Sequence, residues 1–128
     1  MKALLDTHTF LWWDLDDPHI SALAGELIGS DDSEILVSTA SLWEIAIKAS
    51  RRRLELPGPV ERYVPARLVT YRFKPLPVTV EHALRVAALP PIHGDPFDRL
   101  LVAQAQVEGL PIITADPAIG RYDVDVIW

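Results

Sequence analysis

The chain contains no cysteine among its 128 residues. Disulfide bonds and thiolate–metal sites are therefore excluded, whatever the protein does. The sequence also lacks a long hydrophobic run. The apolar stretch near its start, KALL, already ends at Asp6. Such a stretch is too short for a signal peptide or a membrane span, so we expect a cytoplasmic protein that does not use a membrane.

Basic residues are in the minority, since 12 Lys and Arg stand against 18 Asp and Glu and give a formal net charge of −6. Proteins that hold nucleic acid by bulk electrostatics usually carry a basic field, so this balance argues against that class. This charge balance still allows a protein that binds phosphate groups through metal ions, because acidic side chains are needed to hold those ions. The composition, 49% hydrophobic and 23% charged, is typical of a globular protein. The length predicts a single domain, residues 1–128.

Short apolar runs alternate with helical patterns along the chain. We expect strands at residues 2–5, 34–37, 75–78, 111–114 and 124–127, and helices at residues 17–28, 41–50, 60–71, 79–89 and 96–108, with helical turns at 9–13 and after Asp116. This alternation predicts a parallel sheet with right-handed crossovers. Because the strands are apolar throughout, helices should cover both faces. The predicted fold class is α/β, a three-layer sandwich around a short, mostly parallel central sheet.

Four acidic side chains fall at one edge of such a sheet. Two of them follow strands and two lie in the first turn of a helix: Asp6, Asp116, Glu44 and Asp98. In this fold the carboxyl ends of strands and the amino ends of helices share the edge at which ligands bind. The sequence places no basic residue to neutralise the four acids, so together they favour a metal site. Carboxylates without His or Cys partners suit Mg²⁺ or Mn²⁺.

Each acid also has a purely structural explanation. Glu44 could complete a capping box with Ser41, Asp98 could interact with the helix dipole, and Asp116 could cap a turn. Asp6 is the hardest to explain in this way, because a carboxylate that closes a central apolar strand is costly unless something pairs with it. The structural and the metal-binding explanations both stay open for each residue taken singly.

The segment IHGDPFDRLL contains further polar residues near the predicted edge. Asp95 is a good N-cap and Pro96 fits the first helical position, so Asp95 is interpreted as a helix start whose part in a metal site stays open. His93 is interpreted as a loop residue and not as a ligand. Arg99 could face a phosphate or neutralise the acids.

Four segments in order, LLDTHTFLWW, SLWEIAIK, HGDPFDRLLVAQA and TADPAIGRY, resemble the PIN-domain ribonucleases, specifically the VapC-type toxins of bacterial toxin–antitoxin pairs. The resemblance runs from residue 2 to residue 128, and HGDPFDRLL and TAD are its specific parts. It implies a PIN-like fold and a metal-dependent endoribonuclease that a cognate antitoxin silences and that is usually a homodimer. The family's acidic residues correspond here to Asp6, Glu44, Asp98 and Asp116. Many relatives have asparagine in place of Asp116 and a further acid where this chain has Ile119.

The four acids support metal-assisted hydrolysis of phosphodiester bonds, with Mg²⁺ or Mn²⁺ activating a water and stabilising charge on the phosphate. The resemblance implies that the substrate is RNA. The alternative is a PIN-fold module that binds a protein or RNA without cutting it. Other classes fail at particular positions. A haloacid-dehalogenase-like phosphatase needs an acid where His8 stands, and the chain has no GxxxxGK[ST] phosphate loop.

Overall fold

One five-stranded sheet organises the chain, and the structure, a computed structural model, describes residues 1–128 of it. The strands are β1 (Lys2–Leu5), β2 (Glu34–Ser38), β3 (Lys74–Leu76), β4 (Ile112–Ile113) and β5 (Val126–Ile127). They lie in the order β3-β2-β1-β4-β5, and every neighbouring pair is parallel. The first strand of the chain is therefore the central strand of the sheet.

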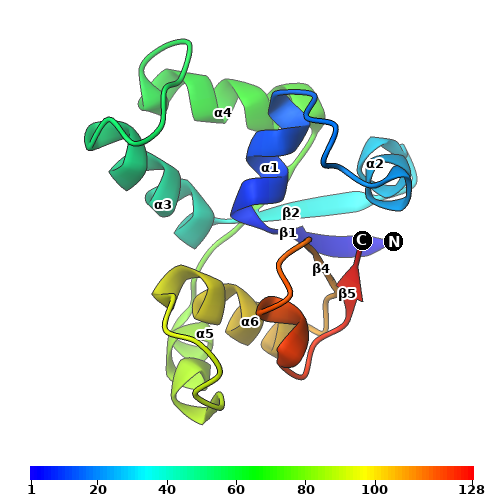
Figure 1. Ribbon diagram of the computed structural model, residues 1–128, viewed down its shortest axis with the longest axis vertical. Coiled ribbons are helices and arrows are strands. Elements are labelled where there is room, and N and C mark those ends of the chain that lie inside the picture. Colours follow the sequence, from blue (N-terminus) through cyan, green and yellow to red (C-terminus); the bar gives the residue numbers. More distant parts are fainter.

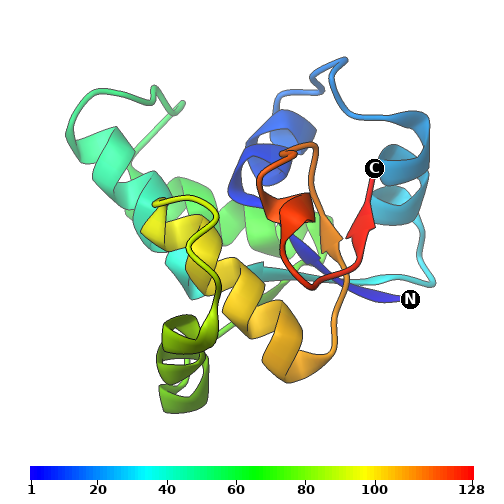
Figure 2. The ribbon, with the colours of Figure 1, turned by 60° about the horizontal axis from the view of Figure 1, so that its bottom comes forward.

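Helices cover both faces of this sheet (Figure 1). One face carries α1 (Thr7–Asp14), α2 (Ala22–Gly29), α3 (Thr39–Ser50) and α4 (Val60–Tyr71). The other carries α6 (Pro96–Glu108) with α5 (Val80–Arg85) beside it, as Figure 2 shows, and the short 3₁₀ turns η1 (Val86–Ala88) and η2 (Ile119–Arg121). The predicted three-layer α/β sandwich is confirmed. No helix has both the length and the apolar character that crossing a membrane requires.

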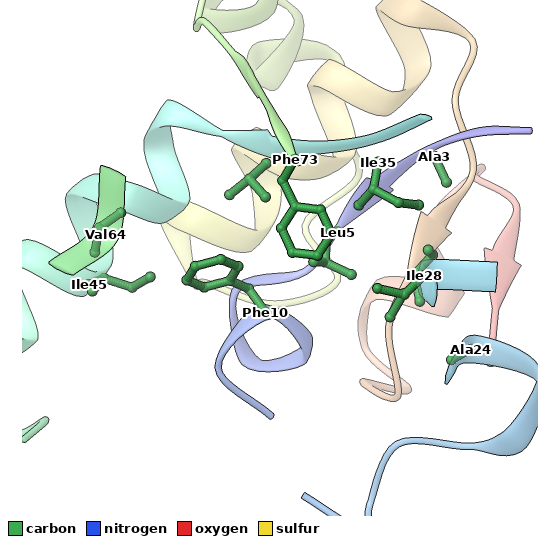
Figure 3. Close-up of a cluster of buried hydrophobic side chains, with 11 residues drawn as sticks. Ala3, Leu5, Phe10, Ala24, Ile28, Ile35, Ile45, Val64 and Phe73 are labelled. Atoms are coloured by element: carbon green, nitrogen blue, oxygen red, sulfur yellow. The ribbon is translucent and has the colours of Figure 1, made fainter. Parts of the chain in front are cut away.

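Two hydrophobic cores lie on the two faces because successive side chains of a strand point in opposite directions. Along β1, Ala3 and Leu5 belong to the core under α1–α4, which Figure 3 shows around Phe10 and Phe73. Leu4 belongs to the core under α6. All three strand residues are 0% exposed. Packing on both faces therefore fixes the end of β1, where Asp6 follows.

Helix α3 begins earlier than predicted. Its N-cap is Ser38, whose hydroxyl accepts a hydrogen bond from the Ala40 amide at 3.0 Å. Ser41 lies inside the helix, fully buried, and accepts a hydrogen bond from the Thr7 hydroxyl at 2.8 Å. The predicted capping box of Ser41 with Glu44 is therefore wrong, and Glu44 lies in the second turn of α3 and not in the first.

Other element boundaries differ by a few residues. Helix α1 is longer than the predicted turn at 9–13, and α2 begins at Ala22 with Ser21 as its N-cap, not at residue 17. The third strand is Lys74–Leu76 and not residues 75–78, because the Val78 amide donates to the Thr39 hydroxyl at 3.2 Å and so leaves the strand ladder. The predicted helix at 79–89 is α5 followed by the 3₁₀ turn η1, and β4 and β5 are each two residues shorter than predicted. The order of the predicted strands and helices is that of the structure.

Candidate functional site

Asp6 follows β1 at the centre of the sheet, and its side chain is almost completely buried at 2% exposure. Its Oδ2 accepts a hydrogen bond from the Thr114 hydroxyl at 2.8 Å, whereas its Oδ1 is buried without any hydrogen-bond partner. Asp6 occupies the N-cap position of α1 but makes no side-chain capping bond. Burial raises the pKa of Asp6, and the Thr114 hydroxyl opposes this effect. A buried carboxylate with one free oxygen is costly, and helix capping does not account for it here.

Thr114 links Asp6 to Asp116. The Asp116 amide donates to the Thr114 hydroxyl oxygen at 3.0 Å, and the same hydroxyl donates to Asp6. The Asp116 side chain accepts from the Ala118 amide at 2.9 Å, which is the turn-capping geometry considered from the sequence. Its charge nevertheless contributes to the raised pKa of Asp6, so the two carboxylates interact. The sequence had not singled out Thr114, although a hydroxyl at a strand end beside an acid was a signal that could have identified it.

Asp95 and Asp98 have different roles at the start of α6. Asp95 is the N-cap, and its Oδ1 accepts from the Phe97 amide at 2.9 Å and the Asp98 amide at 3.0 Å. The interpretation of Asp95 as a helix start is confirmed. Asp98 makes no capping bond with its side chain, whose Oδ2 contacts His93 instead.

The environment of Asp98 disfavours its negative charge. Burial is the main cause that raises the pKa of Asp98 to about 6, and the charges of Asp95, Asp6 and Asp116 act in the same direction. A hydrogen-bonding contact with His93, 3.2 Å from Nε2 to Oδ2, lowers the pKa and partly offsets this effect. The pKa shifts thus link Asp6, Asp98 and Asp116 into one interacting group.

The surroundings of Glu44 differ from those of the three aspartates. It is 5% exposed, its Oε2 forms a salt bridge with Lys48 Nζ at 2.9 Å, and its Oε1 is buried without a partner. The expectation that no basic residue neutralises the acids is therefore wrong for Glu44. The structure brings the three aspartates into interaction and pairs Glu44 with Lys48.

Arg99 does not face the carboxylates. Its Nη1 donates to the Pro90 carbonyl at 2.8 Å and to the Tyr122 hydroxyl at 3.0 Å. The expectation that Arg99 could neutralise the acids is therefore wrong. His93 lies in the loop before α6, as expected, but its ring contacts both Asp98 and Tyr122.

The acidic edge borders a cavity of about 250 Å³ whose lining residues are Asp6, His8, Trp12, Ala115, Asp116 and Pro117. In their present positions no three His, Asp or Glu side chains form a group that could hold a metal ion. The donor atoms nevertheless fit a hard cation in kind, because they are carboxylate oxygens and because the buried Oδ1 of Asp6 and Oε1 of Glu44 lack partners.

Comparison with known proteins identifies the family. The family model of the PIN domain matches residues 3–125. The chain is 32% identical over 115 residues to Ribonuclease VapC22 of Mycobacterium tuberculosis, an alignment that covers 89% of this chain and 86% of that protein. Both results agree with the resemblance found in the sequence.

Solved structures share the fold across the whole chain. The crystal structure of VapBC2 from Rickettsia felis, bound to a DNA fragment from their promoter, matches with a TM-score of 0.73 and 14% identity over 99% of this chain and 98% of that one. FitAcB from Neisseria gonorrhoeae matches with a TM-score of 0.65 and 20% identity over 100% of this chain and 97% of that one. The family model and the VapC22 match show that the chain belongs to the PIN-domain family, as a relative of the VapC ribonucleases.

Proposed function

We propose that this chain is an endoribonuclease that depends on Mg²⁺ or Mn²⁺, hydrolyses RNA phosphodiester bonds and acts as the toxin of a toxin–antitoxin pair. The observation that carries the proposal is the state of Asp6, a carboxylate 2% exposed with one unpartnered oxygen. It interacts with Asp98 and Asp116 at the edge of the sheet where ligands bind in this class of fold. The relationship to a protein named ribonuclease supports the same activity.

Asp6, Asp98 and Asp116 would hold the cation through carboxylate oxygens, and Glu44 would be the fourth acid of the site. When bound, a divalent cation supplies Lewis-acid stabilisation of the phosphate charge and lowers the pKa of a water. Binding requires side-chain movement, because no three acids are grouped for it in their present positions.

The surrounding residues orient the acidic side chains for binding a cation. Thr114 engages Oδ2 of Asp6 and leaves Oδ1 available. Asp95 fixes the first turn of α6 and so places Asp98 within that turn. The low exposure of Asp6 strengthens electrostatic interactions at the site, because a buried charge is poorly screened by water.

The same proposal includes partners and location. A cognate antitoxin would cover the acidic edge, where an arginine could form charge-assisted hydrogen bonds with the carboxylates. Solved proteins that share the fold include DNA-bound VapBC from Salmonella typhimurium and a toxin–antitoxin complex from Klebsiella pneumoniae. We further propose a single domain over residues 1–128 that works in the cytoplasm as a homodimer.

The test is cleavage of RNA by the purified chain without antitoxin. Excess EDTA should abolish cleavage, and Mg²⁺ or Mn²⁺ should restore it. Asp6→Asn should be inactive at saturating metal, whereas Asp95→Asn should keep much of the activity because asparagine caps a helix nearly as well as aspartate. Undiminished cleavage in excess chelator would contradict the metal mechanism. RNA that is bound but not cut at saturating Mn²⁺ would favour the alternative of a binding module.

A further inference from the structure

A chain of hydrogen bonds runs from Arg99 in α6 through Tyr122, the residue that follows η2, and back to Asp98. Arg99 Nη1 lies 3.0 Å from the Tyr122 hydroxyl oxygen. That hydroxyl lies 2.7 Å from Nδ1 of His93, and Nε2 of His93 lies 3.2 Å from Oδ2 of Asp98. Tyr122 is 4% exposed, and the His93 ring is largely shielded from solvent.

The direction of the chain follows from the chemistry of its first member. A guanidinium has only donors, so the Tyr122 oxygen accepts from Arg99. The single hydroxyl proton of Tyr122 is then free to donate to Nδ1 of His93. With Nδ1 as an acceptor, the neutral imidazole carries its proton on Nε2, where it donates to the Asp98 carboxylate.

We propose that His93 is a positioning residue for Asp98: its neutral Nε2–H tautomer, fixed by Tyr122 and Arg99, holds Oδ2 of Asp98 and leaves the other carboxylate oxygen for the cation. This inference rests on the proposed function, in which Asp98 binds the metal. Hydrogen-bonded partners of this kind orient metal ligands and are worth a factor of about 10–100 in metal affinity or activity.

Hydrogen bonds from Arg99 hold the loop that carries His93 in place. Arg99 also donates to the backbone carbonyl of Pro90 at 2.8 Å, with longer bonds to those of His93 and Leu89 at 3.5 Å. Its guanidinium lies over the Tyr122 ring, 5.9 Å from the centroid, and the His93 and Tyr122 rings are 5.5 Å apart. One arginine of α6 therefore holds both the loop backbone and the tyrosine that orients the histidine.

The tautomer of His93 gives a direct test that requires neither metal nor RNA. Nitrogen-15 NMR of the ring nitrogens should show a neutral Nε2–H imidazole for His93, and Tyr122→Phe should convert it to a mixture of tautomers. His82 is an internal control, because the Thr79 amide donates to its Nδ1 at 3.0 Å and fixes the same tautomer away from the site. Its signals should not change. A His93 protonated on Nδ1, or unaffected by Tyr122→Phe, would overturn the inference.

Calorimetric titration with Mn²⁺ tests the effect on the metal site. His93→Ala should weaken Mn²⁺ binding about 10-fold or more. His93→Gln should recover most of the loss, because its side-chain amide can donate from the position of Nε2. Tyr71→Phe is the matched control, since it removes a hydroxyl that bonds Asp14 at 2.5 Å on the other face of the sheet. Its Mn²⁺ affinity should equal that of the wild type.

The Mn²⁺ titrations distinguish a failure of the positioning role from a failure of the proposed function. Wild-type protein that binds Mn²⁺, with equal affinity in His93→Ala, would overturn the positioning role and leave the proposed function intact. Wild-type protein that binds no Mn²⁺ would overturn both. Equal losses in His93→Ala and His93→Gln, with the melting temperature unchanged, would also contradict a role through the Nε2–H donor.

Discussion

Replacing Asp98 by asparagine should stabilise the protein near neutral pH while it removes cleavage. Burial raises the pKa of Asp98 from 3.8 to about 6. At about 1.4 kcal/mol for each pH unit, this difference corresponds to about 3 kcal/mol of unfavourable free energy for the ionised carboxylate in the folded protein. The side chain retains 14% exposure, and solvent screening reduces the cost to about 1–2 kcal/mol. Asparagine carries no charge and does not bear this cost.

The sign of the pH dependence follows from the raised pKa. Below pH 3.8 the carboxyl of Asp98 is protonated in both the folded and the unfolded chain, so it does not affect stability. Between pH 3.8 and about 6 the unfolded chain releases its proton first, and the folded protein loses stability as the pH rises. Above that range the cost is fully present. The advantage of Asp98→Asn should therefore be small at low pH and complete above neutrality.

Thermal unfolding in EDTA provides the assay. The melting temperature of Asp98→Asn should exceed that of the wild type by about 3–8 °C above neutral pH, and the gain should nearly vanish near the unperturbed pKa of aspartate. Asp95→Asn, which keeps its cap, is the control and should gain less. A lower melting temperature of Asp98→Asn above neutral pH, or an equal gain at both pH values, would refute this reasoning. In saturating Mg²⁺ the same variant should lose cleavage by orders of magnitude, and near-wild-type cleavage would refute the ligand assignment.

Three further predictions concern a hydrogen bond at the proposed site, the packing of the hydrophobic core and the growth of cells that express the chain. Thr114→Val removes the hydroxyl that donates to Asp6, so it should reduce cleavage and cost about 1–3 kcal/mol in denaturant unfolding, while Thr114→Ser should behave like the wild type. Phe10→Ala, at a side chain 1% exposed, should cost about 3–5 kcal/mol by the same measurement, and a cost below about 1 kcal/mol would contradict the packing described. Expression of the chain alone should arrest bacterial growth, and co-expression of a small protein encoded beside it should relieve the arrest. Harmless expression of folded, RNA-cleaving protein would argue against the toxin role.

The sequence predicted the parts of the fold that depend on local pattern. Short apolar runs between turn residues located all five strands, because strands buried on both faces have no polar alternation. The same pattern gave the position of the acids, since Asp6 and Asp116 follow strands and the edge of a parallel sheet gathers strand ends. The start of α6 was also predictable, because Asp95 and Pro96 are a strong local signal.

The remaining features depend on contacts that local pattern does not determine. Ser38 and Ser41 are both suitable caps, and only the burial of Ser41 against Thr7 decides between them. Lys48 is the exception, because its spacing of four from Glu44 on a helix is a local signal that could have predicted the ion pair.

The surroundings of Asp98 and Asp6 could not be predicted in this way. The contact of His93 with Asp98 spans a loop and a helix start, and the hydrogen bond from Thr114 to Asp6 joins two strands that are distant in the chain. Such contacts depend on loop conformation and on strand order. A hydroxyl at a strand end marks Thr114 as a candidate, but no local signal pairs it with Asp6.

The bond between Asp6 and Thr114 also bears on when the protein becomes active during its own synthesis. It joins residues 108 positions apart, and β1 acquires its neighbour β4 only when that late segment is present. At about 5–20 residues per second, a ribosome needs about 5–20 s to make the intervening chain. Once Glu44 has been made, the nascent chain holds it together with Asp6 but still lacks Thr114 and Asp116, so the edge has neither its hydroxyl link nor its last acid. The proposed nuclease site is thus complete only after translation has passed nearly the whole sheet.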